Sequence, residues 1–167
     1  DWIYNPVPAI SYGLNVYLEY FGFDLTLFFQ GVQGVDIISD LKKETDLWSG
    51  LNISNLNKGT RLLDAWSPTN TDSDIPALSI ADNNNEKRVS SYWVEDGSYL
   101  KLKNIQLGYN LPEKALQKLH MERWRFFVSA QNVFTIHSRS FTGVDPENPN
   151  YGYPNALNIT VGTSLNF

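Results

Sequence analysis

The fold is decided by residues 155–167, Asn-Ala-Leu-Asn-Ile-Thr-Val-Gly-Thr-Ser-Leu-Asn-Phe. Apolar and polar side chains alternate along this stretch, and a period of two is the pattern of a β-strand with one apolar and one polar face. The apolar face carries Leu157, Ile159, Val161, Leu165 and Phe167, interrupted only by Thr163. A tilted strand needs about 9–11 residues to cross a bilayer, so this stretch is long enough to do so.

Four other stretches alternate in the same way. The first two are joined by a tight reversal at Tyr20-Phe21-Gly22, which predicts a β-hairpin. In the third, the apolar side chains change parity near Lys103-Asn104, which predicts either a β-bulge or a passage from an exposed extension to the membrane wall. We therefore predict an all-β, antiparallel fold with five strands, near residues 9–20, 22–33, 92–111, 123–136 and 155–167.

The connections between these strands alternate between long and short. Residues 34–91 and 137–154 are long and polar, with helical turns predicted within 36–48 and 60–66, whereas the short connection after Pro112 holds one helical turn over 113–119. Long loops at one end and short turns at the other are typical of transmembrane β-barrels. Five strands cannot close such a barrel, and lipid does not tolerate an open sheet edge. We therefore predict a barrel segment that further strands complete.

Composition excludes several other classes of protein. The formal net charge of −5 argues against a nucleic-acid partner, because phosphate binding needs clustered Lys and Arg. The absence of Cys excludes disulfides and thiolate metal sites. No apolar run approaches the roughly 18–20 residues of a membrane helix. No signal peptide precedes Asp1-Trp2-Ile3, so we expect a piece of a longer chain.

Several motifs stand in a fixed order along the chain. Residues 95–112 are Glu-Asp-Gly-Ser-Tyr-Leu-Lys-Leu-Lys-Asn-Ile-Gln-Leu-Gly-Tyr-Asn-Leu-Pro, and residues 125–135 are Arg-Phe-Phe-Val-Ser-Ala-Gln-Asn-Val-Phe-Thr. Residues 23–31 and 64–68 precede them, and residues 143–147, Tyr153-Pro154 and Phe167 follow. Together they resemble the SusC/RagA family of TonB-dependent outer-membrane transporters over nearly the whole chain. The plug domain, TonB box and carboxypeptidase-like extension of that family are absent, which fits a C-terminal barrel fragment.

The resemblance implies a function for the whole protein. It would be a plugged barrel of about 22 strands in the outer membrane of a Gram-negative cell, importing glycans or peptides. Its partners would be a SusD-like surface lipoprotein, the TonB complex acting through the plug, the remaining strands and the membrane lipid. The loops 34–91 and 137–154 would be extracellular, and Phe167 would carry the signal for barrel assembly.

Candidate site residues are few. Trp48, Trp66 and Trp93 could stack on a ligand or a partner, although loop packing is the simpler interpretation. Tyr20, Phe21 and Trp124 fit an aromatic girdle at the membrane interface, and core packing is the alternative.

Nothing in the sequence predicts catalysis, a metal site or a cofactor. Asp145 and Glu147 flank Pro146, which favours a loop-shaping role over acid–base work. His120 and His137 each lack a second His at ligand spacing. We therefore expect that the protein is not an enzyme.

A second hypothesis is a soluble extracellular β-sandwich that binds carbohydrate. It explains the aromatic content and the alternating strands, but not the order of the motifs or the terminal Phe167. A third is a structural outer-membrane protein without transport.

Overall fold

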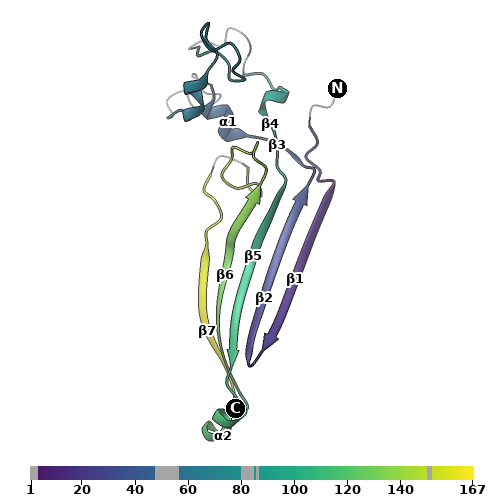
Figure 1. The fold of residues 1–167 in the computed structure, drawn as a ribbon, viewed down its shortest axis with the longest axis vertical. Helices are drawn as coiled ribbons and strands as arrows, with labels where there is room; N and C mark the ends of the chain where they lie inside the picture. The colour runs from purple at the N-terminus through teal and green to yellow at the C-terminus, as the bar shows by residue number, and fades with distance from the viewer. Residues whose placement is uncertain (1–3, 48–56, 80–84, 86, 150–151) are drawn as a thin grey trace. The chain divides into compact units, whose positions relative to one another are not determined.

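The computed structural model describes residues 4–47, 57–79, 85, 87–149 and 152–167 and divides into two compact units (Figure 1). The sheet unit comprises residues 8–33, 98–137 and 155–167. The loop unit comprises residues 1–7, 34–97 and 138–154. Each unit is described by itself below.

Five strands form the sheet unit. They are β1 (Ile10–Tyr20), β2 (Phe23–Gln33), β5 (Tyr99–Asn110), β6 (Arg123–His137) and β7 (Asn158–Asn166). Their order in the sheet is β1-β2-β5-β6-β7, and every neighbouring pair is antiparallel. Figure 1 shows them as one sheet of long neighbouring strands. The predicted all-β, antiparallel fold is confirmed.

The two short connections follow from local chemistry. Phe21 and Gly22 both have positive φ, 45° and 82°, which is the conformation of a two-residue hairpin turn that matches the twist of the strands. Between β5 and β6, Pro112 leads into α2 (Glu113–Leu119), the helical turn that the sequence predicted. The helix ends at His120, whose left-handed backbone turns its N–H onto the carbonyls of Leu116 and Gln117.

The loop unit has a small sheet of its own, which the sequence did not predict. β3 (Asp36–Ile38) pairs with β4 (Val94–Asp96). The predicted start of the third long strand at residue 92 is therefore wrong, because β5 begins only at Tyr99. At Gly97, directly after β4, the chain lies close against the segment that contains β3. Its N–H donates to the Val35 carbonyl at 2.8 Å, and a Cβ there would lie 2.7 Å from Ile37. Three-residue strands are also too short to show a period of two.

The described part of the loop unit also contains three short helices. They are α1 (Asp40–Thr45), η1 (Thr60–Asp64) and η2 (Ser91–Trp93). The helical turns predicted within 36–48 and 60–66 are thus confirmed by α1 and η1. The apolar core consists of Leu47, Leu62, Ile75, Trp93 and Phe141.

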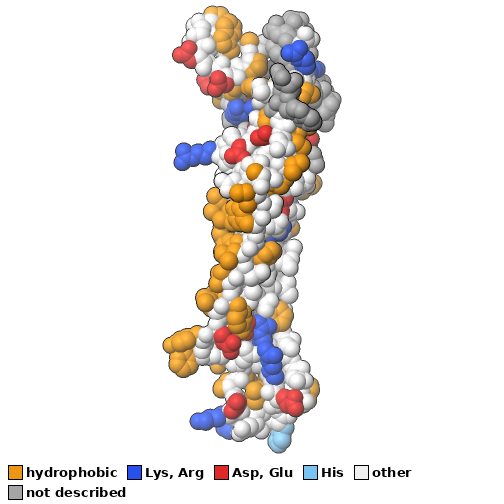
Figure 2. Space-filling model, turned by 90° about the vertical axis from the view of Figure 1, so that its right-hand side faces the viewer, with side chains coloured by type: hydrophobic (Ala, Val, Ile, Leu, Met, Phe, Trp, Pro, Cys, Tyr) orange, Lys and Arg blue, Asp and Glu red, His pale blue; other side chains and the backbone are white. Residues whose placement is uncertain are grey.

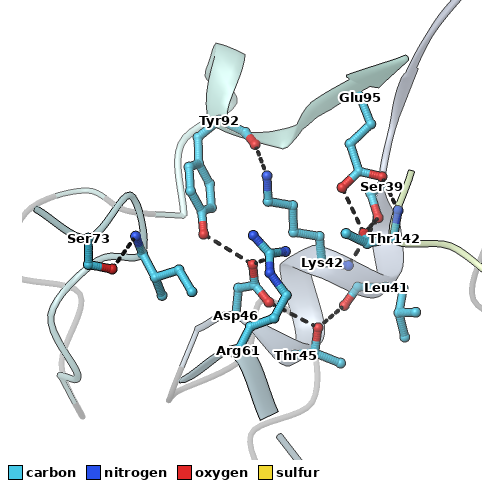
Figure 3. Close-up of polar contacts among 11 residues, drawn as sticks. Ser39, Leu41, Lys42, Thr45, Asp46, Arg61, Ser73, Tyr92, Glu95 and Thr142 are labelled. Atoms are coloured by element: carbon cyan, nitrogen blue, oxygen red, sulfur yellow. Dashed lines mark hydrogen bonds and ion pairs between the residues drawn. The ribbon is translucent and has the colours of Figure 1, made fainter. Parts of the chain in front are cut away.

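A buried polar network joins three segments of the loop unit (Figure 3). Ser39 caps α1 by accepting a hydrogen bond from the Lys42 N–H at 3.1 Å, and its hydroxyl lies 3.1 Å from that of Thr142. Thr142 donates both its N–H and its hydroxyl to Glu95, at 2.9 and 2.7 Å. Because Glu95 is only 4% exposed, its carboxylate is satisfied by the protein and not by water.

A second group of contacts in the same figure surrounds Asp46. This buried carboxylate accepts from the Tyr92 hydroxyl at 3.1 Å and pairs with Arg61 at 2.8 Å. Burial, followed by the charge and hydrogen bond of Asp46, raises the pKa of Tyr92, so the phenol remains a donor. Lys42 donates to the Tyr92 carbonyl at 2.6 Å, and its ammonium lies 4.0 Å from the centre of the Tyr92 ring.

None of the helices in the described parts of the chain has the length and hydropathy of a membrane-spanning helix. Among the same residues, no group of three or more His, Asp or Glu side chains is arranged to hold a metal ion.

Replacing Glu95 tests the network. Glu95→Ala should loosen residues 138–149, because the half-buried N–H and hydroxyl of Thr142 then lose their acceptor, at a cost of about 1–3 kcal/mol. Hydrogen–deuterium exchange of the full-length protein should show faster exchange there. Asp72→Ala, at an exposed acidic position in the same unit, is the control. Equal exchange in the two variants would contradict the structural role of Glu95.

Candidate functional site: the two faces of the sheet

One face of the five-stranded sheet is apolar from edge to edge. Cross-strand pairing aligns its side chains in rows, of which two cross all five strands. One row consists of Leu18, Leu25, Leu107, Val128 and Val161, and the next of Val16, Leu27, Ile105, Ala130 and Ile159. Val161 is 79% exposed and Leu18 57%. A continuous exposed apolar surface of this kind marks a contact with a membrane or with a partner.

An irregularity at Lys103 keeps this face continuous. Phe29 and Leu27 on β2 pair with Leu102 and Ile105 on β5, so β5 contains one extra residue between those pairs. The extra residue returns the odd-numbered Ile105 to the face that carries the even-numbered Leu102. The β-bulge predicted at Lys103-Asn104 is therefore confirmed.

A further extra residue lies on β6 opposite the same point, where Leu102 and Ile105 pair with Phe134 and Ala130. Asn132 takes a left-handed conformation there, with φ of 55°. Its amide donates to the carbonyl of Ala156 at 3.0 Å. The regular β6–β7 pairing ends at Gln131, so the Asn132 side chain extends the link between these two segments by one hydrogen bond.

Thr163, the polar interruption noted in the sequence, also has a partner. Its hydroxyl accepts from the Trp124 indole N–H at 2.8 Å and donates to the Arg125 carbonyl at 3.1 Å. The Thr163 hydroxyl and the Trp124 indole N–H are thus satisfied within the protein, which is the condition for placing them near hydrocarbon.

The opposite face is polar and, at mid-sheet, uncharged. At mid-sheet, two neighbouring rows cross all five strands. They are Asn15, Phe28, Asn104, Gln131 and Asn158, and next to them Tyr17, Thr26, Gln106, Ser129 and Thr160. In the part of Figure 2 that the sheet forms, hydrophobic side chains gather along one side and polar ones along the other. Amides and hydroxyls both donate and accept, so this face suits a hydrated lumen.

Charges gather nearer the end of the sheet that holds the short connections. Arg125 on β6 reaches across β5 to Asp24 on β2, and its Nε lies 3.0 Å from Asp24 Oδ2, with a second bond to Oδ1. Gly108 lies beneath this ion pair, and a Cβ there would be 2.4 Å from both partners. Asn110 adds a third hydrogen bond to Asp24 at 3.3 Å. The bidentate pair therefore links three strands on the polar face.

A depression of about 530 Å³ opens beside this pair. Asp24 and Arg125 line it together with Glu19, Arg123 and Leu116 of α2. Glu19 accepts from the Tyr17 hydroxyl at 3.0 Å, and Arg123 donates to the Asn110 side-chain oxygen. Sequence reasoning missed this group because its members lie far apart along the chain. The sequence shows only the alternation that places these residues on one face of the sheet.

The three tryptophans predicted as contact residues differ in their surroundings. Trp93 is 2% exposed, and its indole N–H donates to the Arg88 carbonyl at 3.0 Å. Its ring is part of the loop-unit core and has no face open to a ligand, which corrects the contact prediction for this residue. Trp66 is 43% exposed, and its contact role stays a prediction. Trp48 lies outside the described residues.

Of the three aromatic residues predicted near the hairpin end, Tyr20 and Phe21 are exposed and Trp124 is half-buried. Tyr20 pairs with Phe23, Phe23 with Tyr109 and Tyr109 with Phe126, so one aromatic row crosses four strands. Only the register reveals this row, which fits the predicted girdle. Phe21 and Phe167 are exposed as well. The assembly role of Phe167 stays a prediction.

Asp145 shapes its loop as the sequence suggested. Its carboxylate accepts from the Glu147 N–H at 3.0 Å, which is a local turn contact. Asp145 is buried, and the turn closes with a hydrogen bond from the Asn148 N–H to its carbonyl.

A methyl group at residue 108 should disrupt the ion pair. Gly108→Ala should lower the thermal stability of the purified full-length protein, because Asp24 and Arg125 must separate, an overpacking cost of about 1–3 kcal/mol. Gly152→Ala is a matched control, since no atom lies within 4 Å of a Cβ there. Equal unfolding temperatures for the two variants would show that Asp24 and Arg125 can move apart without loss of stability.

Known proteins resemble the chain over almost all of its length. TonB-dependent receptor P3 of Formosa agariphila is 38% identical over 179 residues, which cover 98% of this chain and 17% of that receptor. TonB-dependent receptor P26 of the same organism is 28% identical over 178 residues, with 98% and 17% covered. No protein-family model matches the chain.

Solved structures agree with these relatives. The RagAB peptide importer in its open-open state superposes with a TM-score of 0.78 at 28% identity, covering 96% of this chain and 17% of that one. A second structure, of the RagAB peptide transporter, superposes with a TM-score of 0.76 at 27% identity and covers 97% of this chain and 18% of that one. The chain thus spans about a sixth of the length of the proteins it matches. It belongs to the TonB-dependent receptors of the SusC/RagA type, and its five-stranded sheet is an antiparallel segment of their β-barrel.

Proposed function

We propose that this segment forms part of the barrel wall of an outer-membrane importer in a Gram-negative cell. The observation that carries the proposal is the pair of opposed faces. Exposed apolar rows cover one side of the sheet, and uncharged hydrogen-bonding rows cover the other. In a membrane barrel the first faces lipid and the second faces the lumen. The named relatives are receptors and importers, which favours transport over an enzymatic role.

The rest of the machinery belongs to the same proposal. β1 and β7 are the outer strands of the sheet, and further strands of a barrel of about 22 would pair with them. The connections 34–91 and 137–154 leave the end of the sheet opposite the hairpin turn and would face outward. A SusD-like lipoprotein would cap the barrel, and the TonB complex would act through a plug. The likeness to RagAB supports peptides, with glycans as the other substrate class.

The sandwich hypothesis fits the structure less well. A β-sandwich needs a second sheet to cover the apolar face of the first. The other sheet in the described residues has two strands of three residues each, and it belongs to the loop unit. Val161 and Leu18 remain exposed, as a membrane-facing surface requires.

Fractionation of the native cells tests location and partnership together. The full-length protein should be recovered from the outer membrane in detergent and should co-purify with a surface lipoprotein. Deleting its gene should abolish uptake of its nutrient, and so should inactivating TonB. Recovery as a soluble monomer would contradict the barrel assignment, whereas normal uptake without the gene would favour the structural, non-transporting alternative.

A charge on the apolar face should impair membrane insertion. Val161→Arg should lower outer-membrane levels of the full-length protein, because Arg on a lipid-facing strand costs about 2–4 kcal/mol near mid-bilayer. Thr160→Arg, one residue away on the polar face, is the matched control and should insert normally. Immunoblots of purified outer membranes provide the measurement. Equal levels of the two variants would contradict the assigned orientation of the faces.

A further inference from the structure

The apolar face of the sheet is not evenly filled, because a groove of about 280 Å³ lies in it near the hairpin end. Six apolar and aromatic side chains from two neighbouring rows line this groove. They are Phe23, Tyr109 and Phe126 of the aromatic row, and Leu107, Val128 and Val161 of the next row inward. The two rows are two residues apart along each strand, a distance of about 7 Å.

The aromatic rings at the groove pack sideways and leave the space between them open. Tyr109 is the register partner of Phe126, yet its ring packs on Phe23, with 4.6 Å between the ring centroids. The Phe126 ring packs on Trp124 at 4.9 Å, and the Trp124 indole is held by its hydrogen bond to Thr163. Contacts within the sheet therefore fix both ring pairs before anything binds, and a preformed site lowers the entropic cost of binding.

Further strands of a barrel would leave this groove open. Five of the six lining side chains lie on β2, β5 and β6, and each of these strands already has a neighbour on both sides within this chain (Figure 1). A strand added beyond β1 or β7 would join in the plane of the sheet and would not cross its face. Whatever fills the groove therefore approaches it from the side of the apolar face.

The chemistry of the walls favours a hydrocarbon chain as the occupant. Apart from the Tyr109 hydroxyl, the six side chains have no hydrogen-bonding group, so water gains little there. An empty groove would lose dispersion contacts on both walls. A flexible methylene chain lying in the groove makes contacts on two sides and beneath it, whereas the same chain on a flat part of the face makes contacts on one side only.

Tyr109 adds a polar group at the end of the groove nearer the hairpin turn. Its ring lies beside that turn, because a Cβ at Gly22 would be 3.5 Å from Tyr109 Cε2. Among the residues that the structure describes, none accepts a hydrogen bond from the Tyr109 hydroxyl. Tyrosine at a membrane interface places its ring among apolar groups and its hydroxyl among headgroups. This hydroxyl is therefore free to donate to an ester or phosphate oxygen of a lipid.

We propose that this groove binds one acyl chain of a glycerophospholipid, with the ester and phosphate groups at the level of Tyr109 and the chain running inward past Leu107 and Val128. The proposal rests on the proposed function, which turns the apolar face toward lipid and the hairpin end toward the periplasmic leaflet. It goes further by assigning one retained lipid to one place on that face. Lipid on the rest of the face exchanges freely with the bilayer.

Photolabelling of the purified full-length receptor tests the proposal. The probe is dioleoyl phosphatidylethanolamine with a diazirine near the ester end of one acyl chain, reconstituted with the receptor in liposomes. Irradiation follows extraction into a mild detergent and repeated exchange, which removes freely exchanging lipid. Mass spectrometry should then find label on residues 107–109 and 126–128. Leu14, which is exposed on the same face but outside the groove, should carry little label.

Filling the groove should remove this label. Val161→Trp adds a large ring at the groove and should lower labelling of residues 107–109 and 126–128 at least about tenfold. Ile159→Trp is the matched control, because Ile159 lies two residues away on the same strand and face, is exposed and does not line the groove. This variant should be labelled as strongly as the native receptor.

Each outcome bears on the proposal. Label spread evenly over the apolar face, or lost on detergent exchange, overturns it, as does equal labelling of the two Trp variants. Native mass spectrometry of the same sample that finds a second receptor copy or another protein in place of the lipid overturns it as well. The labelling of the native receptor needs no mutation, so the test stands even if a variant fails to fold.

Irradiation in the intact liposomes separates this proposal from the one on which it rests. Label on the apolar face before extraction, with none retained at the groove afterwards, refutes the lipid site alone. Absence of label from the whole apolar face in the liposomes would instead refute its membrane-facing orientation.

Discussion

Alignment of apolar side chains across five strands is the constraint on which the sheet unit depends. Each strand alternates, but a continuous face forms only if every neighbouring pair adopts the register that matches like with like. Between Leu102 and Ile105 the register would fail without an inserted residue, and β5 and β6 both contain one. The insertion leaves the backbone irregular at Asn132, whose side chain compensates with a hydrogen bond to Ala156. A uniform apolar surface is thus maintained at the cost of local irregularity.

The polar face of the sheet differs from the apolar face in how it accommodates charge. Its middle rows are neutral, and the buried carboxylate of Asp24 is matched by Arg125 across an intervening strand. The geometry works only because Gly108 has no side chain beneath the pair. Glu19 and Arg123 line the same depression and remain exposed. Paired and exposed charges therefore line one depression and differ in burial.

The loop unit is held together by polar contacts more than by a large apolar core. Glu95 and Asp46 are buried carboxylates whose partners come from segments far apart in the sequence, Thr142 for the first and Arg61 and Tyr92 for the second. Buried carboxylates satisfied in this way specify one arrangement of long connections, because any other leaves a charge unpaired. Trp93, which the sequence presented as a possible contact aromatic, is instead buried in the small apolar core of this unit.

The sequence by itself determined the five long strands, their two faces, the irregularity at Lys103-Asn104 and the helical turns α1, η1 and α2, because each depends on the chemistry of neighbouring residues. Motif order also identified the family. Only the tertiary structure decided the pairing of β3 with β4, the aromatic row that includes Tyr109, and the meeting of Asp24 with Arg125 over Gly108. These features join residues tens of positions apart. Periodicity fixes which face a side chain occupies but not its neighbour on the next strand, which is set by register and long-range packing.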